Sequence, residues 1–296
     1  MKPTIEYLPG FEELAVKRFP RMSREEFQQW ATLLKDRTGM RLPDNRISFL
    51  VTNLGMRMRQ LGISNYQAYF DYVQNGREAM IEWDRLVHYL TVHETRFLRN
   101  ESVLAMIREH YLPEYMDGDV PETVTIDVWS VGCSTGEEPY SVAMAIDDFM
   151  SQQDGDYYLG VTASDISRDA LAIGRKGIYS RKQIKEIEPD WLDKYFTITE
   201  DDKFQVQEAL RKRICFNYLN ILDVGKTPIG KMNIITCQNL LIYFDREHRI
   251  EIANTLVEHL LPGGLLILGV GEILHWDNPN VERYPHANTL AYKHIQ

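Results

Sequence analysis

The sequence predicts an α/β protein in which a domain built on a mostly parallel sheet follows a small helical domain. Segments typical of strands and helices alternate from Val124 to Val270, as they do in parallel sheets. Up to Leu90, apolar residues recur instead with the spacing of amphipathic helices. Between Gly177 and Asn217, short alternating runs predict a small antiparallel insertion, to which we assign Ile214 and Phe216.

Composition limits the classes of function. The chain has 296 residues, 44% of them hydrophobic, which is enough for two domains. A formal net charge of -10 argues against a nucleic-acid partner, because phosphate binding needs clustered Lys and Arg. Cys133, Cys215 and Cys237 lack the spacing of a metal site, so we expect neither metal nor disulfides. With no bilayer-spanning apolar run and no signal-peptide core in MKPTIEYLPG, we expect a cytoplasmic protein that is not membrane-inserted.

Four helices are expected at the start of the chain. Ser23 and Glu26 form a capping box before an apolar stripe that reaches Leu34. A second stripe follows Pro43, a third follows a capping box at Ser64 and Gln67, and a fourth spans 79–90. Basic residues gather around the second helix in an otherwise acidic chain: Lys35, Arg37, Arg41, Arg46, Arg57 and Arg59. They form either a solvated helix face or a docking surface for an acidic partner.

The turn after the first strand is the expected centre of the chemistry. In VTIDVWSVGCSTGEEPYSVAMA, which begins at Val124, a strand ends at a small-residue turn and a helix follows. The turn lacks the G-x-G-x-x-G spacing of dinucleotide sites, so a nicotinamide dehydrogenase is a distant alternative. Glu137 and Glu138 disfavour a pyrophosphate and suit the ammonium and hydroxyl groups of S-adenosylmethionine. Alternatively, this is an ordinary strand-to-helix turn whose acids complement the helix dipole.

Later strands bring further polar groups to the same edge of the predicted sheet. Asp165 ends the second strand, where such folds bind ribose hydroxyls, and residues 237–239 follow a strand at 232–236. A helix is expected from Asp245 to Leu260, and a turn at 262–264 leads into a strand over 265–270.

Five motifs resemble one family, the CheR chemotaxis receptor protein-glutamate O-methyltransferases. LTVHETRFLRN is similar to its L-T-x-N-x-T-x-F-F-R signature, and WSVGCSTGEEPYS to W-S-A-x-x-S-T-G-E-E-P-Y-S. ASDIS with GRKGIYS, then CQNLLIYFD and LLPGGLLILGVGE, match later motifs in the same order. The resemblance runs from about Phe27 to Val270.

The resemblance implies a helical domain for receptor docking (1–90), a linker with a connecting helix (91–122) and a Rossmann-like S-adenosylmethionine-dependent methyltransferase domain (123–296) with a β-subdomain inserted at about 177–217. It implies catalytic roles for Arg99 and Tyr243, which would face the reacting carboxylate. The implied contacts to S-adenosylmethionine, or to its product S-adenosylhomocysteine, are His93, Thr95, Arg99, Glu138, Asp165, Asn220, Ile221, Cys237, Gln238 and Asn239. The implied partner is the cytoplasmic helical domain of methyl-accepting chemoreceptors.

Some positions depart from the family pattern. His93 stands in place of Asn, Leu98 in place of Phe, Gln238 in place of Arg, and Gly271 in place of Ser. The insertion carries the acidic, glycine-free stretch TITEDDKFQ where tether-dependent members have a glycine-bearing loop, so we expect no tether-peptide binding. The chain is thus expected to esterify receptor glutamates. The alternative is a catalytically silent S-adenosylmethionine-binding sensor or docking protein; retention of Arg99 and Tyr243 favours the enzyme.

Overall fold

The helical domain contains the four helices predicted at the start of the chain. The computed structural model describes residues 21–91, 93–117 and 123–295, so the segment MKPTIEYLPG lies outside the described residues. The N-terminal helices are α2 (Arg24–Thr38), α3 (Ile47–Leu61), α4 (Tyr66–Asn75) and α5 (Ala79–Leu90), with a 3-10 turn, η1 (Asp44–Arg46), before α3. Within the described residues, no helix is both long and apolar enough to cross a bilayer.

Side-chain caps mark the starts of α2 and α4, and the cap of α4 differs from the prediction. Ser23 Oγ accepts from the Glu26 amide at 3.1 Å and Glu26 Oε2 accepts from the Ser23 amide at 2.7 Å, which confirms the first capping box. The capping box predicted at Ser64 is wrong, because Asn65 caps α4 by accepting from the Ala68 amide at 2.7 Å. Asn and Ser are similarly effective N-caps, so the sequence pattern did not choose between neighbours.

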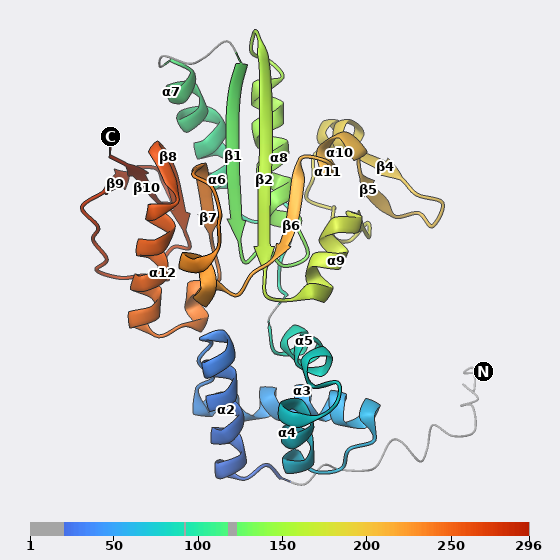
Figure 1. The fold of residues 1–296 in the computed structure, drawn as a ribbon. Coiled ribbons are helices and arrows are strands. Elements are labelled where there is room, and N and C mark those ends of the chain that lie inside the picture. The colour runs from blue at the N-terminus through green and yellow to red at the C-terminus, as the bar shows by residue number, and fades with distance from the viewer. Residues whose placement is uncertain (1–20, 92, 118–122, 296) are drawn as a thin grey trace, which may run out of the picture.

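A seven-stranded sheet in the order β6-β2-β1-β7-β8-β10-β9 organises the second domain. Its parallel strands are β1 (Thr123–Val131), β2 (Asp156–Asp165), β6 (Ile214–Tyr218), β7 (Met232–Cys237) and β8 (Leu260–Leu268). β9 (Val281–Tyr284) and β10 (Leu290–His294) complete it as an antiparallel edge. The parallel strands end on the side that faces the helical domain (Figure 1). The predicted α/β class is confirmed.

The boundary of β8 differs from the prediction. The strand begins at Leu260, so Pro262, Gly263 and Gly264 lie inside it and not in a turn before it. Pairing with β7 shifts register between Met232 and Ile234, and Gly263 has a φ of 73°, as expected for a bulge that bends a strand without ending it.

Helices connect the strands and cover the sheet. Between α5 and β1 in sequence come α6 (Glu101–Met106), the π-helical turn η2 (Ile107–Tyr111) and α7 (Leu112–Met116). The later ones are α8 (Glu137–Met150), α9 (Arg168–Lys176), η3 (Ile221–Lys226), η4 (Leu241–Tyr243) and α12 (Arg246–Glu258).

The insertion forms a separate three-stranded antiparallel sheet in the order β3-β5-β4. Its elements are β3 (Ile178–Tyr179), α10 (Pro189–Tyr195), β4 (Phe196–Ile198), β5 (Phe204–Val206) and α11 (Glu208–Arg211). The expectation that Ile214 and Phe216 belong to this small sheet is wrong, because they pair in parallel with Val161 and Ala163 of β2. Alternation indicates a strand but not its partner, which is why the pattern assigned them to the wrong sheet.

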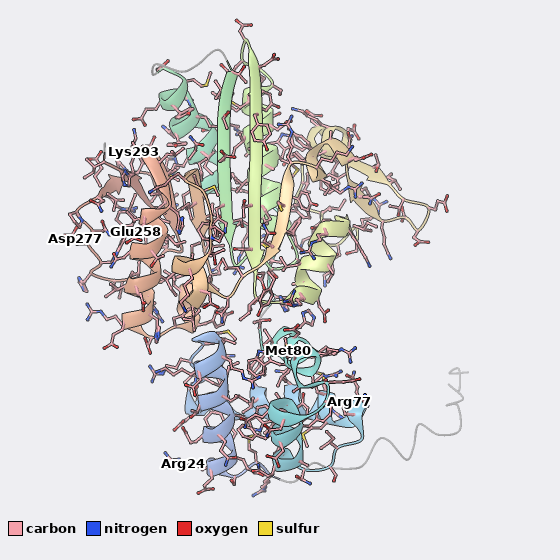
Figure 2. All side chains as sticks on the ribbon, viewed as in Figure 1. Arg24, Arg77, Met80, Glu258, Asp277 and Lys293 are labelled. Carbon is pink, nitrogen blue, oxygen red and sulfur yellow. The ribbon has the colours of Figure 1, made fainter. Side chains whose placement is uncertain are left out.

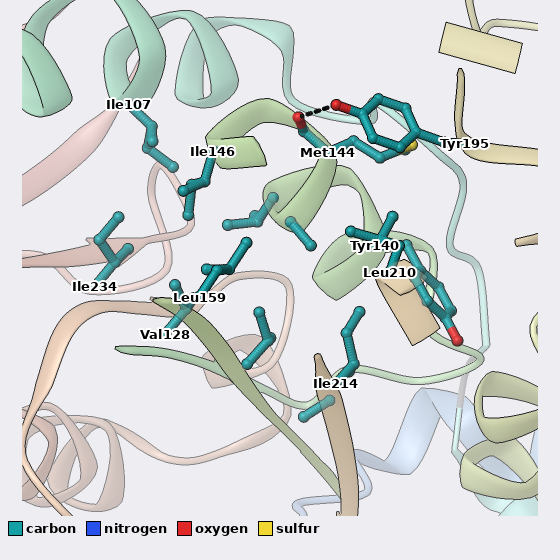
Figure 3. Close-up of a cluster of buried hydrophobic side chains, with 14 of the residues drawn as sticks. Ile107, Val128, Tyr140, Met144, Ile146, Leu159, Tyr195, Leu210, Ile214 and Ile234 are labelled. Carbon is teal, nitrogen blue, oxygen red and sulfur yellow. Dashed lines mark hydrogen bonds between the residues drawn. The ribbon is translucent and has the colours of Figure 1, made fainter. Parts of the chain in front are cut away.

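Apolar side chains cover both faces of the main sheet. On one face, Val128, Leu159 and Ile234 pack beneath α8, and the Tyr195 hydroxyl anchors the insertion by donating to the Met144 carbonyl at 3.2 Å (Figure 3). On the other face, strand residues pack against α12, and this apolar cluster continues into the helical domain through Phe27. The two domains therefore share one continuous core on that side.

Polar contacts also join the domains at the carboxyl edge of the sheet. The Arg41 amide donates to the Tyr243 carbonyl at 2.7 Å, and the Asn220 side chain donates to the Arg37 carbonyl at 2.7 Å. On the α5 side, Arg168 Nε bonds Asp84 at 3.0 Å. Side chains from both domains meet between the two ribbons in Figure 2. These contacts hold the helical domain over the end of the sheet where the site lies.

Candidate active site

The glycine turn after β1 opens one wall of the site. Gly132 has a φ of 73° and Gly136 a φ of 99°, a backbone conformation that favours glycine. A Cβ at Gly136 would also lie 3.0 to 3.1 Å from the Tyr179 hydroxyl, Gly174 and Phe216. The amides of Gly132 and Cys133 both donate to the Ser164 carbonyl, at 2.8 and 2.9 Å. The turn is therefore tied to the end of β2, next to Asp165.

Of the two acids after this turn, only Glu138 faces the cavity. Its Oε1 accepts from Ser130 Oγ at 2.8 Å and from Thr236 Oγ1 at 2.6 Å, and its Oε2 accepts from Gln238 Nε2 at 3.1 Å. Burial raises the pKa of Glu138, and these neutral donors oppose the shift. Glu137 instead turns away, where Thr135 Oγ1 donates to it at 2.6 Å.

Asp165 occupies the end of β2, as predicted. The Ser134 amide donates to its Oδ2 and the Ser167 amide to its Oδ1, both at 2.8 Å. Burial raises the pKa of this carboxyl group, and the two amides oppose the rise. Each oxygen retains a lone pair for a ligand hydroxyl.

Two adjoining cavities follow the carboxyl edge and share Gly132, Ser134, Asn239 and Tyr243 as a common wall. The first contains these predicted site residues: Thr95, Arg99, Glu138, Gln238, Asn239 and Tyr243. The second contains His93, Asp165, Asn220, Ile221, Asn239 and Tyr243, and is bounded by Thr38 and Met40 of the helical domain. One continuous cleft therefore has Glu138 towards one end and Asp165 towards the other.

Cys237 is the one predicted site residue that lines neither cavity. It is fully buried with Ile235 on the opposite face of β7, while Thr236 faces Glu138. Alternation of side chains along a strand separates them, so the side chain of Cys237 points away from the pocket and only its backbone is placed to contact the cofactor. Asn220 does lie in the wall, but its side chain is engaged by the Arg37 carbonyl and the Leu222 amide and thus fixes the interdomain loop.

Arg99 lies at an exposed margin of the first cavity. Its Nη1 donates to the Glu94 carbonyl at 2.5 Å, and its charge acts on both Glu138 and Tyr243. The preceding residue, Leu98, has a φ of 53°, and its amide donates to Ser141 Oγ on α8 at 3.0 Å. Asn239 and Ser134 also have positive φ, so unusual backbone conformations gather around this cleft, as is common at functional sites.

Gln238, which replaces the family's Arg, connects two elements. Its Nε2 donates to Glu138, and its Oε1 accepts from Asn100 Nδ2. Asn100 was not predicted, yet it links the segment before α6 to the strand edge. Gln238 in place of Arg therefore gives Glu138 a neutral hydrogen-bond partner. The bond from Asn100 in turn holds the Gln238 side chain in place.

Ser130 and Thr236 were also missed, although their sequence context carried a signal. They are register partners on β1 and β7, and both donate to Glu138. A buried hydroxyl inside an otherwise apolar parallel strand needs a hydrogen-bond partner. Ser130 in VWSV and Thr236 in IITC could therefore have been predicted to bond a polar group at the site.

His93 replaces the family's Asn at the second cavity and packs on a second histidine. Its ring lies 4.5 Å from that of His88, centroid to centroid, in a stacked arrangement. His93 Nδ1 is 3.1 Å from Ser134 Oγ, and His88 Nδ1 is 2.9 Å from Ser167 Oγ. Burial and His88 lower the pKa of His93, and Asp165 opposes the shift. His93 is therefore neutral at pH 7.

We expect His93→Asn to reduce the loss of stability on acidification. The pKa of His93 is lower in the folded state than its ordinary value of about 6.5, so the folded state favours neutral His93. This contribution to the free energy of unfolding is fully present above about pH 6.5 and is lost as pH falls. Between pH 7.5 and 5, the melting temperature of the wild type should fall more than that of the variant. The exposed His110 provides a control, since His110→Asn should follow the wild type. Parallel curves for His93→Asn and wild type would contradict the expectation.

The fold and cleft together define a class of protein. The sheet has Rossmann-like parallel strands with a glycine turn and two partly buried acids, Glu138 and Asp165, at their carboxyl ends. The hydrogen-bond donors of Glu138 are all neutral, so its carboxylate suits a cationic ligand group. These are the features of an S-adenosylmethionine-dependent methyltransferase. Residues 93–289 match the family model described as CheR methyltransferase, SAM binding domain, and residues 25–91 match CheR methyltransferase, all-alpha domain. The chain belongs to the CheR methyltransferase family.

Curated relatives agree with this assignment. The chemotaxis protein methyltransferase of Borreliella burgdorferi is 29% identical over 88% of this chain and 92% of its own length. The Escherichia coli chemotaxis protein methyltransferase is 31% identical over 85% of each chain, and chemotaxis protein methyltransferase 1 of Pseudomonas aeruginosa is 30% identical over 84% of this chain and 90% of its own. The predicted family, enzyme class and S-adenosylmethionine cofactor are confirmed.

Proposed function

We propose that this CheR methyltransferase transfers the methyl group of S-adenosylmethionine to glutamate side chains on the cytoplasmic helices of chemoreceptors, and that it acts in the cytoplasm. Residues 1–90 would dock the receptor, 91–122 would connect the domains, and 123–296 would bind the cofactor. The main support for this proposal is that Arg99 and Tyr243 line the same cavity as Glu138. Arg99 is the most exposed of the three, so an entering carboxylate can bind it at the margin of the cavity.

The cleft fits S-adenosylmethionine in charge and in hydrogen-bonding capacity. Glu138 accepts from two hydroxyls and one amide in the described structure, so an ammonium group would be its first close cationic donor. Asp165 is oriented by two backbone amides and can accept from ribose hydroxyls. We assign His93, Thr95, Asn220, Ile221, Gln238 and Asn239 to the remaining wall.

The reaction requires orientation more than proton transfer. A glutamate carboxyl group, with a pKa of about 4.3, is already ionised at neutral pH, so no general base is needed. Bound S-adenosylmethionine supplies an electrophilic methyl group, and an O–CH₃ bond forms as the S–CH₃ bond breaks. Arg99 would orient the carboxylate with its planar fork of donors. Burial raises the pKa of Tyr243, which keeps its hydroxyl protonated as a second donor.

The basic surface available for docking is smaller than the sequence pattern suggested. Arg57 is buried and forms a bidentate salt bridge with Glu82. Glu82 Oε1 also accepts from the Tyr69 hydroxyl at 2.6 Å. Lys35 forms an ion pair with Asp245 at 3.3 Å, and Arg37 stacks over Trp83 at 4.6 Å. Arg41 and Arg46 are exposed, and both lie near Tyr243 at the margin of the cleft: the Arg41 amide bonds the Tyr243 carbonyl, and the charge of Arg46 acts on the Tyr243 hydroxyl. We assign receptor docking to that margin.

We expect a receptor C-terminal peptide to bind the insertion only weakly, with a Kd above about 100 μM. The turn between β4 and β5 is closed by a bond of 2.8 Å from the Thr199 amide to the Lys203 carbonyl, and it exposes Glu200, Asp201 and Asp202. These charges repel a peptide carboxylate. Calorimetry with the peptide tests the expectation, and low-micromolar binding would overturn it.

The proposed function is tested with S-adenosylmethionine labelled in its methyl group and receptor-containing membranes. We expect label to enter the receptor and to be released as methanol by mild base, because glutamate methyl esters are base-labile. Calorimetric binding of S-adenosylhomocysteine is measured on the same sample. Cofactor binding without labelling would favour a silent sensor or docking protein.

A further inference from the structure

Three large apolar side chains are exposed on adjacent loops beside the cleft. Ile242 in η4 is 49% exposed, and Val270 and Leu274 in the loop after β8 are each 66% exposed. We call these three residues the apolar shelf. Most large apolar residues of the described chain are buried, so a group of this kind indicates a contact surface.

A shared set of hydrogen bonds joins the two loops of the apolar shelf. The Arg249 guanidinium donates from Nη1 to the Glu272 carbonyl at 2.7 Å and from Nη2 to the Ile242 carbonyl at 3.3 Å. The Leu241 amide donates to Glu272 Oε2 at 3.1 Å. Val270 and Leu274 flank Glu272 in sequence, and Ile242 follows Leu241, so all three lie around one fixed corner.

The corner has a defined shape. Glu272 is buried, and a Cβ at Gly269 would lie 2.1 Å from its Oε1, so a larger residue at position 269 would displace that carboxylate. Gly271 has a φ of 81°, which favours glycine where the family pattern has serine. Val270 and Leu274 are therefore presented on a loop fixed from within.

The apolar shelf meets the first cavity at one of its residues, Ile242. Ile242 lines that cavity next to Tyr243, and Arg96 and Arg99 lie on its margin. Because Arg99 and Ile242 line the same cavity, a macromolecule whose carboxylate binds Arg99 comes close to Ile242. The surface thus offers cationic groups for an acid and, beside them, an apolar area.

We propose that the apolar shelf binds the apolar side chain that lies one helical turn from the methylated glutamate on the receptor helix, and so helps to select which glutamate is esterified. The inference rests on the proposed function. On a helix, residues three or four positions apart lie about 5 to 6 Å from each other, so one face can present an acid and an apolar neighbour together. A glutamate flanked only by polar neighbours leaves the shelf in water and is a poorer substrate.

The test uses Val270→Ser and Leu274→Ser, singly and together, with the full-length chain and receptor-containing membranes. We expect the double variant to raise KM for the receptor about 10-fold, as loss of two partly exposed apolar contacts implies, with kcat and the affinity for S-adenosylhomocysteine unchanged. Ile295→Ser is the control, since Ile295 is 47% exposed directly after β10 and lines neither cavity. A KM within twofold of wild type in the double variant would overturn the proposal.

The substrate provides the matching half of the experiment. Receptors in which the apolar residue one turn from the methylated glutamate is changed to Ser should show the same rise in KM with wild-type enzyme. They should show little further rise with the double variant, because the interacting pair is already lost. If the receptor substitution and the double variant instead raise KM by independent, additive amounts, the receptor side chain does not contact the apolar shelf.

Cosedimentation with the same membranes separates failure of this inference from failure of the proposed function. If wild type transfers no methyl group but the double variant loses membrane binding, the apolar shelf is a receptor contact, whereas the enzymatic proposal fails and the selection of a glutamate fails with it. If transfer is normal and neither KM nor binding changes, the enzymatic proposal stands and the inference fails.

Discussion

Replacing Arg99 by lysine is expected to lower kcat for receptor methylation about 100-fold, because small errors in the placement of reacting groups have effects of that size. Lysine keeps the positive charge but lacks the planar pair of donors that can hold both carboxylate oxygens. It also cannot reproduce the bond from Arg99 Nη1 to the Glu94 carbonyl that fixes the guanidinium at the margin. Steady-state kinetics with receptor membranes measure the change.

Arg96 provides the matched control for Arg99. It is exposed, lies on the same segment and lines the same cavity, but its guanidinium is paired with Glu186 of the insertion. Lysine can keep that ion pair, so Arg96→Lys should change kcat by less than about threefold, as expected for an exposed pair. Equal losses in both variants would indicate a general requirement for arginine in this segment. Wild-type kcat in Arg99→Lys would remove Arg99 from its catalytic role.

Local patterns predicted the elements that arrange these residues. The apolar periodicity of the first 90 residues is realised in α2 to α5, which bury one stripe each, and the alternation of strands and helices gave the parallel sheet. Because parallel strands end at the same edge, the sequence order alone placed the glycine turn, Asp165 and Gln238 together. Those predictions depended on properties of single segments.

The missed features depend on contacts between distant segments. Ile214 and Phe216 alternate like residues of any half-buried strand, and only their pairing with β2 assigns them to the main sheet. Asn100 gains its role from Gln238, and Glu272 from the corner at Leu241, both far away in sequence. The motif places Cys237 beside the site but does not show that the pleat of β7 turns its side chain to the other face.

Replacing Glu138 by glutamine is expected to weaken binding of S-adenosylmethionine roughly 10- to 100-fold, which corresponds to losing a hydrogen bond to a charged group worth about 1.5 to 3 kcal/mol. Glutamine keeps one oxygen to accept from Ser130 and Thr236 but presents an amide to the Gln238 amide. Both S-adenosylmethionine and S-adenosylhomocysteine carry the ammonium group, so calorimetry should find similar losses for the two.

Stability and pH dependence distinguish this effect from misfolding. Burial raises the pKa of Glu138 in the folded chain, so the folded state favours its protonated form. The stability that this form contributes is lost as pH rises, and at neutral pH the ionised carboxylate opposes folding. The neutral glutamine avoids that penalty, and the melting temperature without cofactor should therefore rise while cofactor affinity falls. Acidification should weaken cofactor binding in wild type as Glu138 protonates, and less so in the variant, in which Asp165 still titrates.

Glu137→Gln separates the two adjacent acids. Glu137 is equally part of the glycine-turn motif, but it is buried against Thr135 and Gln183 and lines neither cavity. Its replacement should leave the Kd for S-adenosylmethionine within about threefold of wild type, less than the loss of one hydrogen bond to a charged group. If Glu137→Gln instead abolished binding while Glu138→Gln bound normally, the cofactor's ammonium group would have to lie elsewhere in the cleft. The orientation proposed for Arg99 depends on that same end of the pocket and would then fail with it.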